Sequence, residues 1–349
     1  MHGDFMGIEK NMRSSYIDNL KSLLIFFVVI GHFAEAVLSQ SDVFKSMFIW
    51  LYFFHMPLFI FISGFLSKRL TQNKERTLQK SFEYFTLYLI MKFTLSLVKS
   101  FCTGKEIAFS LFSETSVPWY LFAMILMYLT SYALRNINQK LVFCIFVVLA
   151  LFVGYDKEVR DFFVLSRFIV FYPFFILGLN CTDDALKKLK HQKFLVPFAI
   201  IVILGSIAVA YLYPDIVYEF RPMLTARNPY TSLNEPLETY GPLCRLFVYI
   251  VGSVIGLATL IITPKLNLGY LSKVGARTLP IFFFHRQILW VFDKIDLYNI
   301  LQEKLGSFGG NAIWLLLGVL LTFILSIKIF EVPFTWWHNQ LFKKIKAKK

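Results

Sequence analysis

Long apolar runs alternate with short polar segments along almost the whole chain. Each run approaches the length of a helix that crosses a bilayer, about 20 residues. The pattern therefore predicts an all-α integral membrane protein with about ten transmembrane helices in a single membrane domain over residues 1–349. The expected spans are residues 20–38, 47–66, 82–101, 118–134, 141–154, 162–179, 194–213, 242–263, 278–292 and 311–330.

The basic residues gather in every second loop. Lys and Arg concentrate in the following loops and in the C-terminal tail: 67–81, 135–140, 180–193 and 264–277. Because basic loops stay on the cytoplasmic side of a membrane, this alternation predicts that both termini are cytoplasmic. The long polar segment 214–240 then lies outside. A missed or extra span would break the alternation, so its regularity supports the count.

Composition agrees with a membrane protein. The chain is 57% hydrophobic and 17% charged, whereas soluble domains are about 45–50% apolar and about 25% charged. A net charge of +14 in a soluble protein would suggest nucleic acid as a partner. Here positive loops explain the charge, so we expect membrane lipids and an anionic cosubstrate as partners, and no nucleic acid. The expected location is the cell (inner or plasma) membrane, as a multi-pass protein.

The four cysteines are scattered and form no CxxC pair, so neither a disulfide framework nor a metal site is predicted. Ala34-Glu35-Ala36 imitates a signal-peptide cleavage site after the first apolar run. That run contains a Gly-His pair and further spans follow it, so we expect a retained helix.

One face of the first span carries ionisable side chains that are candidates for catalysis; we call this face the stripe. Lys21 and His32 are eleven positions apart, which places them within about 20° of each other and about 16 Å apart along a helix. Asp18 lies on nearly the same face. Ionisable side chains inside a membrane are rare and usually face a cavity or a partner. The stripe therefore predicts a catalytic group of Asp18, Lys21 and His32.

Two further histidines, His55 and His285, also lie in apolar runs. Each is a candidate for the same site, and His285 is the stronger candidate for a catalytic role. The alternative for any of them is a packing histidine that is hydrogen-bonded to a neighbouring helix. Glu35, one turn beyond His32, either orients the imidazole or lies exposed at the outer interface.

A histidine buried in the membrane suits a proton relay, a metal site or a general base. A metal site is disfavoured because no other ligands stand at a fixed spacing. A relay would more often use several buried acids, and the spans contain few. A general base that acts on a hydroxyl needs a near-neutral pKa, which imidazole supplies.

Four motifs resemble one known family. They are the Lys21-x10-His32 spacing, the Phe54-His55-Met56-Pro57 run that continues to Ser63-Gly64-Phe65, Trp119-Tyr120-Leu121 at the start of a span, and Phe284-His285. Together they resemble acyltransferase family three, the integral membrane O-acyltransferases that modify surface sugars. The closest likeness is to the fucose 4-O-acetylase-related group, over essentially the whole chain.

The resemblance implies an activity. Family members take an acyl group, most often acetyl, from cytoplasmic acyl-CoA and pass it to a sugar hydroxyl on the outer side. It implies that Lys21 and His32 are required. Many members also contain Arg-x-x-Arg near the third span, where this chain has only Arg76 and Lys80 at another spacing. Acetyl-CoA would be a donor substrate, with no permanently bound cofactor, and the acceptor a cell-surface polysaccharide or its lipid-linked precursor.

The charges of the chain are compatible with these substrates. Coenzyme A is an anion, so its nucleotide end is expected near Lys21, Arg69, Arg76 or Lys80. For most of these residues the alternative is that they are the basic loop residues that every membrane protein carries on its cytoplasmic side. His55, Glu35, Trp119 and Tyr120 are candidates for holding the acceptor, and the aromatic belt at the interface is the alternative for the two aromatics.

Direct attack by the deprotonated hydroxyl and an acyl-histidine intermediate both remain open. The main alternative function is a polytopic transporter or flippase for a glycan or lipid, with the buried histidines as a relay. A purely structural membrane partner is the third possibility. These hypotheses differ in whether acyl-CoA is consumed and whether His32 is dispensable.

Overall fold

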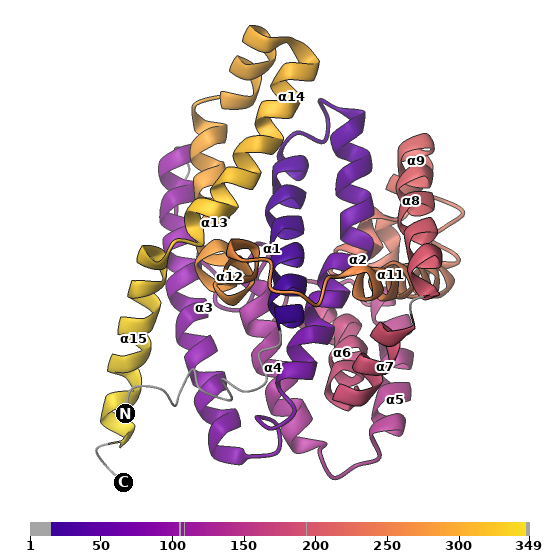
Figure 1. The fold of residues 1–349 in the computed structure, drawn as a ribbon, viewed down its shortest axis with the longest axis vertical. Coiled ribbons are helices and arrows are strands. Elements are labelled where there is room, and N and C mark those ends of the chain that lie inside the picture. Colours follow the sequence, from indigo (N-terminus) through magenta and orange to yellow (C-terminus); the bar gives the residue numbers. More distant parts are fainter. Residues whose placement is uncertain (1–14, 105, 108, 193, 347–349) are drawn as a thin grey trace.

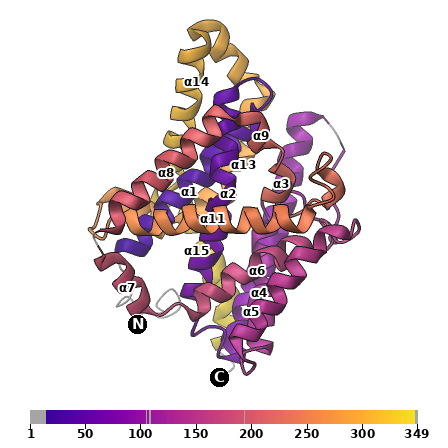
Figure 2. The ribbon, with the colours of Figure 1, turned by 90° about the vertical axis from the view of Figure 1, so that its right-hand side faces the viewer.

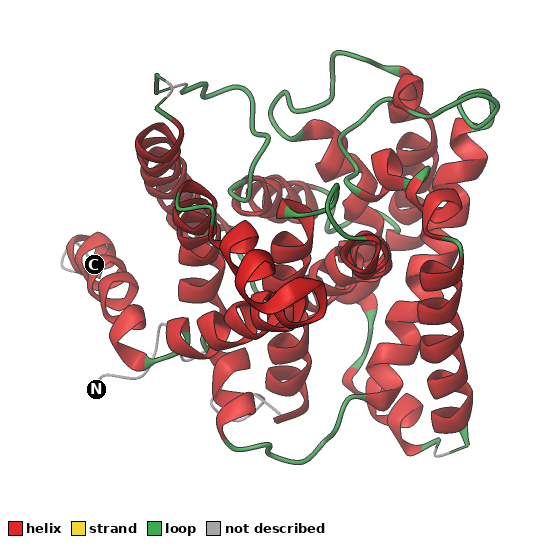
Figure 3. Ribbon diagram, turned by 90° about the horizontal axis from the view of Figure 1, so that it is seen from above, coloured by secondary structure: helices red, strands yellow, loops and turns green. Residues whose placement is uncertain are grey.

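The computed structural model describes residues 15–104, 106–107, 109–192 and 194–346, and this part of the chain is helical and contains no strand. Only an isolated bridge pairs Ser113 with Phe162. Figure 3 shows the helices joined by loops at the ends of the bundle. The predicted cytoplasmic N-terminus falls on residues 1–14 and the end of the basic tail on 347–349, both outside the described residues.

The helices follow the apolar runs. They are α1 (Ser15–Ala36), α2 (Asp42–Leu66), α3 (Lys74–Thr103), α4 (Trp119–Ala133), α5 (Gln139–Phe152), α6 (Leu165–Asn180), α7 (Asp183–His191), α8 (Leu195–Leu212), α9 (Pro214–Tyr218), α10 (Arg221–Leu224), α11 (Gly241–Ile262), α12 (Tyr270–Ala276), α13 (Thr278–Lys294), α14 (Leu297–Leu325) and α15 (Lys328–Lys346). Short 3-10 turns cover Val153–Tyr155 and Tyr230–Ser232.

Local chemistry sets several of the helix ends. The side chain of Asn73 accepts a hydrogen bond from the Arg76 amide at 3.0 Å and so caps the start of α3. Gly104 ends the same helix with a φ of 67°, a left-handed conformation that glycine adopts without strain. Asn138 caps α5 by accepting from the Lys140 amide.

In the described part of the chain, six helices are long and apolar enough to cross a membrane: α1, α2, α3, α8, α11 and α14. Three further apolar helices are shorter, with 15 residues in α4, 14 in α5 and 16 in α6. Helix α13 has 17 residues. The described residues therefore confirm an all-α protein with several helices that are long and apolar enough to cross a membrane. The count of ten spans and the cytoplasmic termini stay predictions.

Helices α1 and α2 form the centre of the bundle (Figure 1). Helix α1 packs against α2, α12, α13 and α14, and α2 packs against α6, α8 and α11 as well. Helices α4, α5 and α6 lie side by side, and α11 crosses α2 on the same face as α8 (Figure 2). The catalytic candidates on α1 and α2 are therefore surrounded by other helices.

Two glycines allow α2 and α6 to touch backbone to backbone. A Cβ on Gly64 would overlap the carbonyl oxygen of Phe175, and a Cβ on Gly178 would overlap that of Phe61. Glycine permits this close approach because it has no side chain. The contact places the last turns of α6 beside the last turns of α2.

Candidate active site

A cavity of about 690 Å³ opens between α1, α2, α3, α4, α6 and α13. Its volume lies within the range of small-molecule sites, roughly 300–1,000 Å³. The charged and histidine side chains that line it are Lys21, His32, Glu35, His55, Lys68, Arg69, Lys80, Glu83, Arg167, Asp183, Arg227 and Arg286. Basic residues outnumber acidic residues, so the cavity attracts anions.

His32 lies on the cavity wall beside Glu35. Its Nδ1 is 3.0 Å from the Glu35 carboxylate, and the two side chains are 20% and 29% exposed. The contact follows from helix geometry, since residues three apart share a face. Glu35 therefore orients the ring and is not an exposed interface residue. An ionised carboxylate can only accept, so a neutral His32 ring that bonds to Glu35 carries its proton on Nδ1 and its lone pair on Nε2. Arg286 approaches the same carboxylate oxygen at 3.6 Å.

His285 stacks against His32 from the side of α13. The two ring centroids are 5.2 Å apart with an interplanar angle of 31°. His285 is fully buried and does not line the cavity. Its Nδ1 donates to the Ile281 carbonyl at 2.9 Å, whereas Nε2 is buried without a hydrogen-bond partner. The ring supports His32 from behind.

Tyr52 connects His32 with His55. Its ring meets His32 edge to face at a centroid distance of 6.5 Å and His55 at 4.8 Å. The His55 Nδ1 donates to the Leu51 carbonyl at 2.6 Å, which fixes the ring on α2. His32 and His55 thus share the cavity, and His285 contacts it only through His32.

One end of the cavity is basic. We name Lys21, Lys68, Arg69 and Lys80 the basic end, since all four line the cavity beside the last turns of α2 and the start of α3. Lys80 pairs with Glu83 at 3.0 Å. The predicted stripe is therefore partly reproduced, because Lys21 and His32 both reach the cavity.

Besides His285, two of the predicted site residues, Asp18 and Arg76, do not line this cavity. Asp18 lies on α1 where the helix packs on α12, and its carbonyl oxygen occupies the space that a Cβ on Gly275 would need. Arg76 is exposed on the first turn of α3. The structure does not bring either of them to His32.

The two predicted aromatic residues both line the cavity at the start of α4. The Tyr120 hydroxyl is 2.8 Å from the Ser63 hydroxyl. Trp119 stacks on Phe171 at a centroid distance of 5.5 Å, and the guanidinium of Arg167 lies 5.0 Å from its ring centroid. Both aromatics are tied into the protein, so they form a fixed wall.

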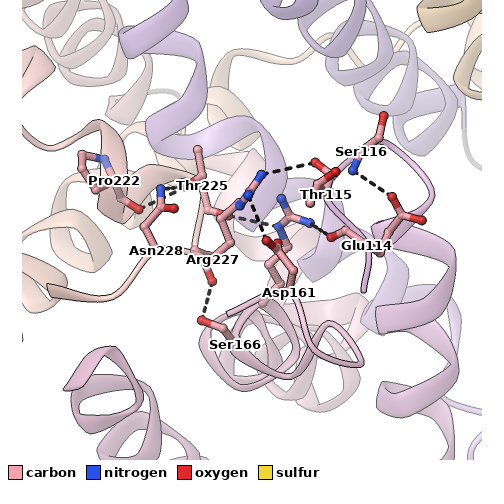
Figure 4. Close-up of polar contacts among 11 residues, drawn as sticks. Glu114, Thr115, Ser116, Asp161, Ser166, Pro222, Thr225, Arg227 and Asn228 are labelled. Carbon is pink, nitrogen blue, oxygen red and sulfur yellow. Dashed lines mark hydrogen bonds and ion pairs between the residues drawn. The ribbon is translucent and has the colours of Figure 1, made fainter. Parts of the chain in front are cut away.

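Arg167 and Arg227 line the cavity, although the sequence did not single them out. We name these two residues the arginine end. Figure 4 shows Arg227 among polar residues of the segments near Glu114, Asp161 and Thr225. The available signal was an arginine two residues into the apolar run of α6, a rare position for a charge.

A buried tyrosine holds the segment that carries Arg227. The Tyr230 hydroxyl donates to the Leu151 carbonyl at 2.6 Å, and its side chain is 1% exposed. Burial raises the pKa of the Tyr230 phenol, so the group stays protonated and continues to donate.

Among the described residues, no three His, Cys, Asp or Glu side chains are placed to hold a metal ion.

Comparisons with known proteins point to one enzyme family. A family model described as an acyltransferase domain matches residues 14–331. The chain is 27% identical over 210 residues to Nodulation protein NolL of Sinorhizobium fredii (strain NBRC 101917 / NGR234), covering 53% of this chain and 54% of that protein. It is also 27% identical over 184 residues to Nodulation protein NolL of Mesorhizobium japonicum (strain LMG 29417 / CECT 9101 / MAFF 303099), covering 48% of each. The chain thus spans about half the length of these curated relatives. No solved structure matches it.

Proposed function

This chain belongs to the acyltransferase family whose model matches residues 14–331, and we propose that it is a membrane O-acetyltransferase that moves an acetyl group from acetyl-CoA to a sugar hydroxyl. The family membership confirms the resemblance drawn from the sequence motifs. The observation that carries the proposal is the pairing of His32 with Glu35 on the wall of an anion-attracting cavity.

The proposed base is His32. With the proton on Nδ1 held by Glu35, Nε2 is free to accept the proton of a sugar hydroxyl. The hydroxyl oxygen then attacks the thioester carbonyl, the ester bond forms and the carbon–sulfur bond breaks. The imidazolium returns its proton to the departing thiolate of coenzyme A. Glu35 stabilises the positive charge that His32 carries between these two proton transfers.

His285 and Tyr52 limit how His32 can move. Their rings pack on the imidazole from α13 and α2, and His285 itself is fixed by its bond to Ile281. A base held in one orientation loses less entropy when the substrate hydroxyl arrives. We therefore give His285 a positioning role behind the catalytic His32. His55, which lines the cavity, is placed to contact the acceptor.

The donor fits the basic end. The phosphates of coenzyme A carry several negative charges, and Lys21, Arg69 and Lys80 offer ammonium and guanidinium groups to them. The pantetheine arm would then extend along the cavity toward His32. Lys21 and His32 are about 16 Å apart along α1, a length that an extended arm of this kind can bridge.

The membrane topology is part of the proposal. With ten spans and both termini cytoplasmic, the basic end faces the cytoplasm, where acyl-CoA is made. The opposite side then receives a glycan or its lipid-linked precursor. The positive loops support this orientation, in the cell membrane.

An acetyl-transfer assay tests the proposal. Membrane vesicles that contain the wild-type protein are incubated with radiolabelled acetyl-CoA, and label is measured in the glycan fraction. We expect transfer that His32→Ala abolishes while the protein still inserts. Movement of glycan or lipid across the membrane without consumption of acetyl-CoA would instead identify a transporter.

A further inference from the structure

Arg167 is a buried cation without a carboxylate of its own. It is 5% exposed, and it makes no ion pair with the described residues. Its Nε donates to the Thr225 carbonyl at 3.3 Å and its Nη1 to the Glu114 carbonyl at 3.1 Å. Backbone carbonyls satisfy hydrogen bonds but supply no full negative charge. A buried charge of this kind is costly unless it is paired.

The two nearby carboxylates are already engaged by other cations. Glu114 accepts from Lys92 at 2.8 Å, and Asp161 pairs with Arg227 at 2.9 Å. Figure 4 shows Asp161 beside Arg227, with Glu114 on the adjoining segment. This group therefore contains three cations and two carboxylates, and the surplus positive charge is at Arg167.

Arg227 has unused donor capacity as well. Its Nη1 donates to the Thr115 carbonyl at 3.5 Å, whereas its Nε is buried without a hydrogen-bond partner. Both arginines line the same cavity as His32. The arginine end thus adds surplus positive charge to this cavity, and the buried Nε of Arg227 lacks a partner behind it.

The arginine end is separate from the basic end. Gly178 packs on Phe61 at the last turns of α2, close to the basic end. Arg167 lies eleven residues earlier on α6, which is about 16 Å along a helix. A single coenzyme A nucleotide bound at the basic end does not neutralise Arg167 at that separation.

We propose that the arginine end binds an anionic group of the acceptor, either the carboxylate of an acidic sugar or the phosphate that joins a sugar to a lipid. Guanidinium groups match carboxylate and phosphate oxygens in geometry as well as in charge. Trp119, whose ring lies against Arg167, supplies an aromatic surface for the sugar beside its anionic group. That the bound anion belongs to the acceptor rests on the proposed acetyl transfer, whereas anion binding at the arginine end does not depend on the reaction.

A binding measurement on the full-length protein in maltoside detergent tests the site. The two anionic probes are citronellyl diphosphate and methyl glucuronide, and their neutral counterparts are citronellol and methyl glucoside. We expect at least one anionic probe to bind wild-type protein more tightly than its counterpart. Arg167→Gln should weaken that binding about tenfold or more, because it removes a charged donor. Coenzyme A binding should stay unchanged.

Arg69→Gln is the matched control at the basic end. It should weaken binding of coenzyme A and leave the anionic probe unaffected. If Arg167→Gln weakens the binding of citronellyl diphosphate alone, the natural ligand carries a lipid-linked phosphate. If it weakens the binding of methyl glucuronide alone, the natural ligand is an acidic sugar. If Arg167→Gln does not fold, Arg227→Gln replaces it with the same expected loss.

Two results would overturn the inference. One is equal binding of the anionic and neutral probes to wild-type protein. The other is loss of the anionic probe in Arg69→Gln with retention in Arg167→Gln, which would assign anion binding to the basic end alone. A protein that binds the probe through Arg167 but transfers no acetyl group would contradict the proposed function and leave this inference standing.

Discussion

Glu35 is the residue whose replacement tests the geometry around His32 most finely. Glu35→Gln keeps the size and shape of the side chain and removes only its charge. The amide oxygen can still accept from His32 Nδ1 across the present 3.0 Å, so the ring keeps its orientation. What is lost is the negative charge beside the imidazolium that forms when His32 takes the hydroxyl proton.

The size of the effect follows from the contact. A hydrogen bond to a charged group contributes about 1.5–3 kcal/mol and a neutral one about 0.5–1.5 kcal/mol, so the substitution costs about 1–1.5 kcal/mol from this source. The loss of Coulomb attraction adds to that cost, reduced by solvent because Glu35 is 29% exposed. We expect kcat to fall about 10- to 100-fold, with little change in KM for acetyl-CoA.

The assay measures initial rates of acetyl transfer in membrane vesicles over a range of acetyl-CoA concentrations, normalised to the amount of inserted protein. Glu303→Gln is the control, because Glu303 is an exposed carboxylate on α14 that does not line the cavity. Arg286→Gln removes the longer 3.6 Å contact to Glu35, together with a guanidinium that lies over the Trp290 ring, and should lower kcat less than Glu35→Gln. A Glu35→Gln variant with the wild-type kcat would refute the role given to Glu35.

Two further changes test the fold and the donor site. Gly178→Ala should destabilise the protein by about 1–3 kcal/mol, because the new Cβ overlaps the Phe61 carbonyl and forces α2 and α6 apart. Thermal unfolding in detergent measures this, and the control Gly205→Ala, with open space around its Cβ in α8, should unfold at the wild-type temperature or slightly above it. Lys80→Gln should raise KM for acetyl-CoA several-fold by removing a cation of the basic end. Arg76→Gln, which lies outside the cavity, should leave KM unchanged. Equal effects of these two substitutions on KM would contradict the placement of the donor.

Local periodicity predicted the parts of the site that lie on one helix. Lys21 and His32 belong to the same stripe of α1, and both line the cavity as the 3.6-residue repeat requires. Glu35 is one turn away from His32, so their contact could also be predicted from the sequence. Asp18 shares the stripe but lies where α1 packs on α12. The repeat specifies the face of a helix but not the neighbour that covers each turn.

The sequence alone did not predict which residues of different helices contact each other. The stacking of His285 on His32 joins residues 253 positions apart, and nothing in the apolar pattern specifies that distance. Arg167 and Arg227 line the same cavity, although 60 positions separate them, and nothing in the apolar pattern predicts that α6 and the segment after α10 converge there. The charge of Arg227 resembles an ordinary loop charge, whereas Arg167 stands near the start of an apolar run. The helical class followed from the apolar runs, whereas α4, α5, α6 and α13 are shorter than the usual span. A hydropathy pattern does not decide how such helices sit in a bilayer.

Mass spectrometry of surface glycans tests the central claim most directly. Glycans are compared between cells that produce the wild-type protein and cells that produce His32→Ala, with equal amounts of inserted protein in the two. The wild-type cells should carry glycans heavier by one acetyl group per modified sugar, and mild alkali should remove that mass, as expected of an ester. The His32→Ala cells should lack it. Undiminished acetylation with His32→Ala would contradict the assignment of His32 as the catalytic base.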